Sequence, residues 1–221
     1  MIWQVQLINT LPTSIYVKIL QKVTFLKQKF NYIAIYKPYR VLTQFSSCPG
    51  KLTLADIFSF PKDVYPVGRL DYDSEGLLIL TNDNYLKSKL INPKEGHKKT
   101  YFVQVEGVPT KSDLEKLKKG FEINIKGAFY KVKAVEAILI DEPKLPNRYP
   151  PIRFRRNIPT SWLSITVTEG KYHQIRKMTA KVGYPTLRLI RYAIENLTLD
   201  LIEIDRPTYF SKRKIYTLLN L

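Results

Sequence analysis

Length, composition and charge already exclude several classes of protein. The chain has 221 residues, 44% hydrophobic and 12% aromatic, so it can bury a core and is not a disordered tail. Lys and Arg number 36 against 19 Asp and Glu, and the formal net charge of +17 favours a nucleic-acid partner over a merely solvated basic surface. The single cysteine, Cys48, excludes an internal disulfide and suits a reducing compartment, and no apolar run reaches the roughly 20 residues that span a bilayer.

Residues 1–30 are predicted to be a basic N-terminal extension. No Asp or Glu precedes Asp56, and residues 16–30 alternate lysines with apolar side chains, as an amphipathic helix would. Two interpretations stay open: an organelle transit peptide, or a short RNA-contacting or disordered extension. Transit peptides favour Arg and Ser, so the second is preferred, and we expect a cytoplasmic protein.

Residues 31–98 are predicted to form the N-terminal half of a catalytic domain. Its strands are β-branched and aromatic runs that end at turn residues, and its second helix begins at a residue able to cap it. The expected elements are strands at 31–36 and 77–81, a short helix at 52–58, and a helix at 85–90 that follows Asn82-Asp83-Asn84 and ends before Asn92-Pro93.

Residues 99–221 are predicted to form the C-terminal half. The clearest helix spans residues 109–120, where Thr110 or Ser112 can cap the start, lysines fill the last turn and Gly120 ends it. The other expected elements are strands at 100–105, 130–140, 162–168, 187–193 and 197–204, and a helix within 171–183. Hairpin-like spacings dominate and no glycine-rich phosphate loop appears, so the fold class is α+β with a mixed, mainly antiparallel sheet and flanking helices.

A proline-rich loop at residues 141–160 separates two of these strands. Its prolines lower the entropic cost of presenting its arginines, which alternate with aromatic residues. Guanidinium groups beside aromatic rings suit phosphate contact and base stacking, so RNA contact is preferred over a solvated linker. The arginines are Arg148, Arg153, Arg155 and Arg156.

An acidic island stands out in this basic chain. Asp71, Asp73 and Glu75 fall at the first, third and fifth positions of a calcium-binding loop, but Asn82 occupies the twelfth position and Ile79 the ninth, which disfavours calcium. A glycosidase with paired carboxylates and a solvated acidic turn remain as alternatives.

The same stretch resembles the central motif of the RNA pseudouridine synthases. Residues 68–71 read Gly-Arg-Leu-Asp, and Asp-Ser-Glu-Gly-Leu-Leu follows at 73–78. Four further segments, in the family's order, resemble the small-subunit synthase A family and, within it, the subgroup of large-subunit synthases of type E. They are residues 37–42, 99–107, 150–162 and 168–188.

The resemblance implies a fold, an activity and roles for particular residues. It implies the pseudouridine synthase fold with a central cleft, and isomerisation of a uridine of large-subunit (23S) ribosomal RNA without cofactor or metal. Asp71 would be the nucleophile, or the group that sustains cleavage of the glycosidic bond, kept ionised by Arg176. Tyr101 would stack on the uracil and could move a proton, and Arg69 would fill the gap left by the flipped base.

The resemblance also implies RNA contacts and two departures from the family. Basic residues of the matched motifs are expected to bind RNA: Lys37, Lys171, His173 and Lys177. Arg40 stands where Gly or a small acidic residue is more usual, and Tyr172-His173 replaces a basic residue followed by Asn.

We further expect a monomer that lacks the N-terminal RNA-binding module, the S4 domain, found on many relatives. The rival from another class is a catalytically inactive RNA-binding or ribosome-assembly protein of the same fold.

Overall fold

A computed structural model describes residues 30–153 and 155–221. The chain divides into two compact units, residues 1–30 and 31–221, and only the second is described below. Apart from residue 30, the helix expected at 16–30 lies outside the described residues. The boundary expected between residues 98 and 99 stays a prediction.

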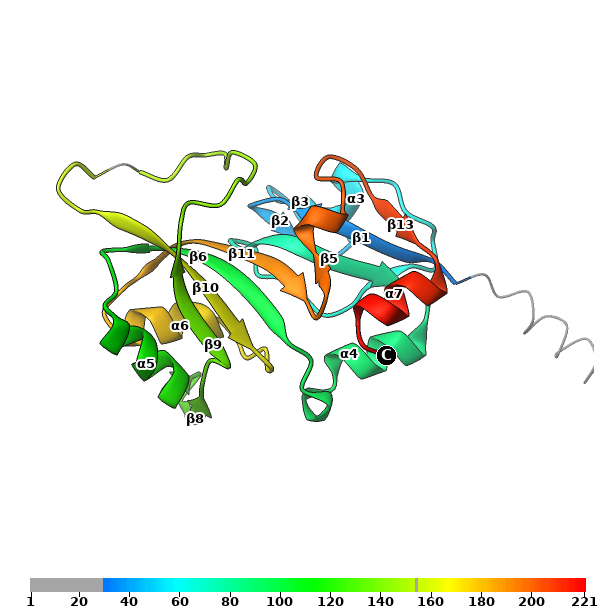
Figure 1. Ribbon diagram of the computed structural model, residues 1–221. Coiled ribbons are helices and arrows are strands. Elements are labelled where there is room, and N and C mark those ends of the chain that lie inside the picture. Colours follow the sequence, from blue (N-terminus) through cyan, green and yellow to red (C-terminus); the bar gives the residue numbers. More distant parts are fainter. Residues whose placement is uncertain (1–29, 154) are drawn as a thin grey trace, which may run out of the picture. The chain divides into compact units, whose positions relative to one another are not determined.

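One nine-stranded sheet forms the framework of the second unit, in the order β13-β1-β5-β11-β6-β10-β9, with β4 on β5 and β12 on β11 (Figure 1). Every strand pair in it is antiparallel except β5 with β11, which confirms the expected α+β class with a mainly antiparallel sheet. The strands are β1 (Tyr32–Lys37), β4 (Tyr65–Pro66), β5 (Glu75–Thr81), β6 (Lys99–Glu106), β9 (Glu136–Ile140), β10 (Thr160–Val167), β11 (Thr186–Ile194), β12 (Leu197–Thr198) and β13 (Thr208–Phe210).

Two small sheets and several helices flank this framework. The strands β2 (Val41–Leu42) and β3 (Leu52–Thr53) pair in parallel, and β7 (Phe121–Ile125) and β8 (Ala128–Val132) form a hairpin. The helices are α3 (Leu54–Ile57), α4 (Asn84–Ile91), α5 (Lys111–Lys119), α6 (Gln174–Lys181) and α7 (Lys212–Leu218), with 3₁₀ turns η2 (Pro93–Glu95) and η3 (Leu199–Leu201). None of the helices in the described residues is long and apolar enough to cross a membrane.

The core follows from the apolar pattern of the strands and helices. Every residue of β1 and β5 is buried, as near-continuous apolar runs predict for central strands, whereas β6 alternates buried and half-buried positions. Thr110 caps α5 through a capping box with Asp113, and Leu114 and Leu117 are buried, which confirms that helix and its inward face.

Two predicted strands differ from the structure. The strand expected at 130–140 is interrupted, because Ala134 N–H donates to the Leu117 carbonyl and Val135 N–H to the Thr166 carbonyl as the chain moves from the small hairpin to the main sheet. The strand expected at 197–204 ends at Thr198, where η3 begins. The strands β2, β3, β4, β7 and β13 and the helix α7 were not predicted, and β3 occupies the first two residues of the helix expected at 52–58.

The junction of β5 with β11 joins the two ends of the main sheet. Its parallel register pairs Ile190 with Glu75 and Arg191 with Gly76. Gly76 has a φ of +107°, and a Cβ there would lie 2.4 Å from the Arg191 carbonyl oxygen and 2.7 Å from the Arg191 nitrogen. Only glycine therefore lets the two strands approach this closely.

Replacing Gly76 by Ala should destabilise the fold strongly, because the added methyl group meets immovable backbone. We expect Gly76→Ala to lower the free energy of unfolding by more than about 2 kcal/mol. Gly127→Ala is the matched control: its φ is +89° with no atom within 4 Å of the new Cβ, so only the left-handed conformation is penalised, by about 1–2 kcal/mol. Urea unfolding measures both, and equal losses would contradict the close-approach argument.

Candidate active site

The loop that carries Asp71 is fixed at several points. Gly68 has a φ of +71° and opens the turn, and Thr43 Oγ1 bonds both the carbonyl and the N–H of Leu70 at 2.8 and 3.2 Å. Ser74 N–H donates to the Asp71 carbonyl at 3.1 Å, and Arg40 N–H donates to the Tyr72 carbonyl at 2.8 Å. The turn that precedes β5 is therefore anchored to residues 40–43 on one side and to its own backbone on the other.

Arg40, one of the two departures from the family pattern, adopts a backbone conformation that favours glycine. Its φ is +58°, in the left-handed region where glycine is the usual residue. Arg40 thus keeps the turn geometry that a glycine would give, at some conformational cost.

Asp71 lines a pocket of about 210 Å³ whose walls come from segments far apart in the sequence. Arg69 and Asp71 belong to the loop before β5, Tyr101 to β6, and Lys171 and His173 to the segment before α6. Tyr101 is 9% exposed, and Ile175 and Leu189 add apolar wall. The structure therefore brings together five of the residues that the sequence singled out.

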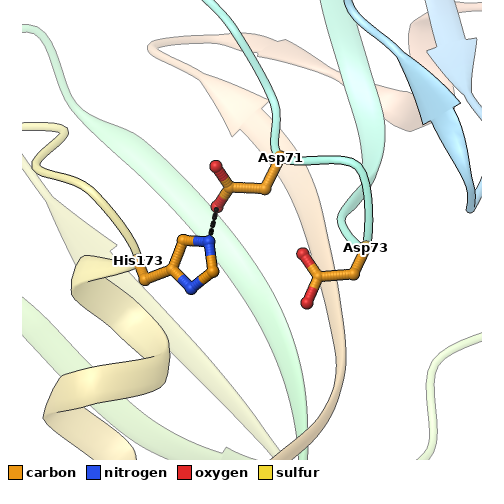
Figure 2. Close-up of side chains that lie close together, drawn as sticks. All are labelled: Asp71, Asp73 and His173. Atoms are coloured by element: carbon orange, nitrogen blue, oxygen red, sulfur yellow. Dashed lines mark ion pairs between the residues drawn. The ribbon is translucent and has the colours of Figure 1, made fainter.

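The partner of Asp71 differs from the one expected. Its carboxylate faces His173 across the ion pair drawn in Figure 2, with Oδ2 3.7 Å from His173 Nε2. Arg176 instead places its Nη2 3.2 Å from Asp73 Oδ2 and donates to the Asp73 carbonyl at 2.8 Å. The predicted pairing of Arg176 with Asp71 is wrong, because the turn directs successive acids to different neighbours.

His173 is positioned by backbone geometry and by stacking. It precedes α6 with a φ of +52°, and its ring stacks on Tyr172 at a centroid distance of 4.1 Å. Lys126, at the β7–β8 turn, lies 5.4 Å from the centre of the Tyr172 ring. The unusual Tyr172-His173 pair therefore forms one wall of the pocket, and ring stacking and Lys126 hold it in place.

Ligand atoms of Asp71, Asp73 and His173 lie within 4.8 Å of one another (Figure 2). Three such groups are compatible with a metal ion, but the Arg176 guanidinium already holds both the carboxylate and the carbonyl of Asp73. A cation would have to compete with this permanent charge. The arrangement thus favours charge pairing within the loop over metal coordination.

Lys37 does not contact RNA in the way that was expected. Its side chain is completely buried, and Nζ donates to the carbonyls of Pro38 and Val41, each at 2.8 Å. Burial lowers its pKa to about 7, although the charges of Glu75, Asp73 and Asp71 oppose that shift. The prediction of a direct RNA contact is therefore wrong, since a side chain without exposed surface cannot reach a phosphate. Lys37 instead interacts electrostatically with the three carboxylates of the acidic island, Asp71, Asp73 and Glu75.

Sequence reasoning missed a buried polar cluster next to the site. Arg188 binds Glu75 through two hydrogen bonds of 2.8 Å, and Tyr36 donates to the same carboxylate at 2.8 Å. Burial and the Glu75 charge raise the pKa of Tyr36. Arg188 also donates to the Pro146 carbonyl at 2.7 Å, which ties the proline-rich loop to the sheet. Glu75 and Arg188 lie in matched motifs, which was the only signal for the pair in the sequence, and Tyr36 lies outside them.

Ser74 was expected only to shape the turn and bind its neighbours. It lines the Asp71 pocket, and its buried Oγ has no hydrogen-bond partner among the described residues.

The arginines of the proline-rich loop lie apart from Asp71. Arg153, Arg155 and Arg156 line a separate pocket of about 250 Å³ at the ends of β6 and β10, where Arg155 pairs with Glu106 at 2.7 Å. Arg148 lies over the Tyr39 ring, 4.1 Å from its centre. Lys177, on α6, does not line the Asp71 pocket either. Their RNA contacts stay predictions.

Comparison with known proteins identifies relatives of this chain. A family model described as RNA pseudouridylate synthase matches residues 31–181. The chain is 51% identical to the ribosomal large subunit pseudouridine synthase E of Vibrio parahaemolyticus, over 78% of this chain and 70% of that protein. It is 46% identical to the protein of the same name in Xanthomonas axonopodis pv. citri, over 76% of this chain and 87% of that one.

A solved structure supports the same fold. The chain resembles a crystal structure of a pseudouridylate synthase with a TM-score of 0.66 and 23% identity, covering 86% of this chain and 74% of that chain. The fold expected from the sequence motifs is thereby confirmed.

The buried Lys37 predicts a measurable pH dependence of stability. Its pKa is about 7 in the folded protein and 10.5 in the ordinary state, so between these values the unfolded chain binds a proton that the folded chain does not. The free energy of unfolding should therefore rise with pH across this window through Lys37. Lys37→Met should flatten that rise, measured by urea unfolding from pH 7 to 10. Lys98→Met, which changes an exposed lysine, should not. An identical slope in all three proteins would contradict the argument.

Proposed function

The chain belongs to the RNA pseudouridylate synthase family, and we propose that it isomerises a specific uridine of large-subunit ribosomal RNA to pseudouridine, with Asp71 as the nucleophile. Relatives that are 46–51% identical carry the name ribosomal large subunit pseudouridine synthase E. The observation that carries the proposal is the single pocket lined by Asp71, Tyr101 and Arg69.

The proposed reaction is redox-neutral and needs only groups that the pocket offers. The bond between N1 and C1′ of uridine breaks, the base turns within the pocket, and C5 bonds to C1′. C5 then loses its proton and N1 gains one, so no atom or electron is added. The Asp71 carboxylate attacks C1′ as the bond to N1 breaks, and the bond between Asp71 and C1′ breaks in turn when C5 bonds to C1′, which regenerates the carboxylate. Asp71 must be ionised for the attack.

The surroundings of Asp71 suit this role. Its carboxylate opens into the pocket while the backbone on both sides is fixed, so the reactive oxygen is held in place. The nearby His173 can stabilise the carboxylate when protonated or donate a hydrogen bond to it when neutral. Arg176 acts through Asp73 and is a positioning residue that fixes the loop.

Tyr101 is suited to hold the base. Its ring is mostly buried in the pocket wall, which gives a flat apolar face for stacking, and its hydroxyl can move a proton. Arg69 is exposed at the same pocket and can fill the gap that a flipped base leaves in the RNA.

Contacts with the RNA backbone extend beyond the pocket. Lys171, His173 and Lys177 lie on or just before α6, and the proline-rich loop presents its arginines at the ends of β6 and β10. Phosphate contacts at both places would orient the RNA without reading its sequence.

Removing the Asp71 carboxylate should abolish the reaction. Large-subunit ribosomal RNA that lacks its modifications is incubated with wild type and with Asp71→Asn, and pseudouridine is mapped by chemical adducts and primer stops. Wild type should modify one site, and Asp71→Asn should lose activity by about 10³-fold or more, because an amide cannot act as the nucleophile.

Asp73→Asn is the matched control, since Arg176 still reaches the Asp73 carbonyl in that variant. It should keep measurable activity. Equal behaviour of wild type and Asp71→Asn would contradict the catalytic proposal, and if neither forms pseudouridine, the inactive RNA-binding rival gains. Release of free base would favour a glycosidase.

The proline-rich loop gives a separate prediction. Replacing Arg153, Arg155 and Arg156 by Ala should weaken RNA binding and flatten its dependence on salt, by up to about 0.9 in the logarithmic slope for each lost phosphate contact. The same loss of charge from α5, by replacing Lys111, Lys118 and Lys119, should change the slope less. Binding titrations across a range of salt concentrations measure both, and an unchanged slope in the loop variant would exclude phosphate contact there.

A further inference from the structure

A second cavity of about 170 Å³ adjoins the Asp71 pocket. The two cavities share Arg69, Tyr101, Glu169 and Gly170 in their walls. The second cavity therefore lies directly beside the first.

Arg191 lines this second cavity and has an unusual charge environment. It is 4% exposed, and its Nε donates to the Leu77 carbonyl at 2.8 Å, but its Nη2 has no hydrogen-bond partner in the described part of the chain. Within the described residues no carboxylate forms an ion pair with it. A buried guanidinium is normally paired, because an unpaired buried charge is costly.

Lys99 places a second cation in the same cavity wall. Among the described residues its Nζ donates to the His97 carbonyl alone, at 3.1 Å, and burial together with the Arg191 charge lowers its pKa, although the Glu195 charge opposes that shift. Like Arg191, it forms no ion pair among the described residues. Two like charges thus lie near each other in partly dry surroundings, which destabilises the free protein.

The nearby carboxylates are already engaged. Glu169 is 3.4 Å from Lys171 and accepts a hydrogen bond from Gln174. Glu195 accepts hydrogen bonds from Lys98 N–H and from Asn220, and it pairs with His97. The cavity therefore keeps an excess of positive charge that its own acids do not neutralise.

We propose that this cavity, formed around Arg191 and Lys99, binds a phosphate group of the RNA backbone next to the nucleotide whose base occupies the Asp71 pocket. A planar guanidinium matches a phosphate better than it matches a water molecule, and an ammonium beside it adds charge. The anion relieves the repulsion between the two cations, so the destabilisation in the free protein becomes binding energy in the complex. The identity of the nucleic acid rests on the proposed function; the anion site itself does not.

The phosphate site predicts that a single substitution will make the free protein more stable and its binding to RNA weaker. Lys99→Met removes the repulsion and keeps the apolar stem, so the melting temperature should rise by a few degrees. The same variant should bind a single-stranded RNA oligonucleotide about tenfold more weakly and lose roughly 0.7–0.9 from the logarithmic salt slope, as one phosphate contact predicts. A merely structural lysine would not produce a more stable protein with weaker RNA binding.

The experiment uses the full-length chain with Asp71→Asn in the background, so that binding is measured without turnover. Lys98→Met, an exposed neighbour, is the control and should change neither quantity. Arg191→Gln, which keeps a donor for the Leu77 carbonyl, should also weaken binding. Inorganic phosphate should raise the melting temperature of the parent protein more than that of Lys99→Met.

An unchanged salt slope in Lys99→Met, or an equal effect of phosphate on both proteins, would overturn the proposal. Failure of the proposed function is a separate result, read from pseudouridine mapping with native Asp71. A wild type that makes no pseudouridine while Lys99→Met still loses salt slope leaves the phosphate site standing and removes the proposed function.

Discussion

The bidentate pair between Glu75 and Arg188 is the interaction on which the site depends. It lies where β5 meets β11, receives Tyr36 from β1, and reaches Pro146 in the proline-rich loop. Replacing a buried pair with well-packed apolar groups is often neutral, whereas removing one partner costs about 3–5 kcal/mol. In this protein the Glu75–Arg188 pair positions the site. The loop that carries Asp71 leads directly into Glu75, so the pair holds that loop against β11. The strand β11 in turn supplies Leu189 and Arg191 to the two cavities.

The three acids of the island each have a different neighbour. Asp71 faces the pocket beside His173, Asp73 holds Arg176, and Glu75 holds Arg188. Lys37 lies buried nearby, where its pKa is lowered by burial and raised by the charges of these three acids. Arginines therefore bind the carboxylates of Asp73 and Glu75 directly, whereas the carboxylate of Asp71 still faces its pocket. This division separates the proposed nucleophile from the residues that position it.

The features that could be predicted from the sequence are those set by residues close together in the chain, and the features that could not depend on contacts between distant residues. The strand β5 and the helix α5 were predictable, because an apolar run and a capping box are local signals. The interrupted strand at 130–140 was not, since the break arises from bonds to Leu117 and Thr166. The site was located through its motifs, but the partner of Arg176 and the burial of Lys37 depend on a turn geometry and a packing that no spacing reveals. Arg191 had no local signal, because its unpaired charge exists only once β11 lies beside β5.

The same pair has a consequence for the order in which the molecule is built. Glu75 and Arg188 are 113 residues apart in the sequence, and Asp73 and Arg176 are 103 apart. Contacts between residues so far apart in the sequence form late, because the entropy cost of closing a large loop comes before the contacts can stabilise the fold. During synthesis, the segment that carries Asp71 therefore emerges well before the strand β11, which supplies Leu189 to the pocket wall. A nascent fragment that ends before β11 carries the Asp71 carboxylate without a completed pocket.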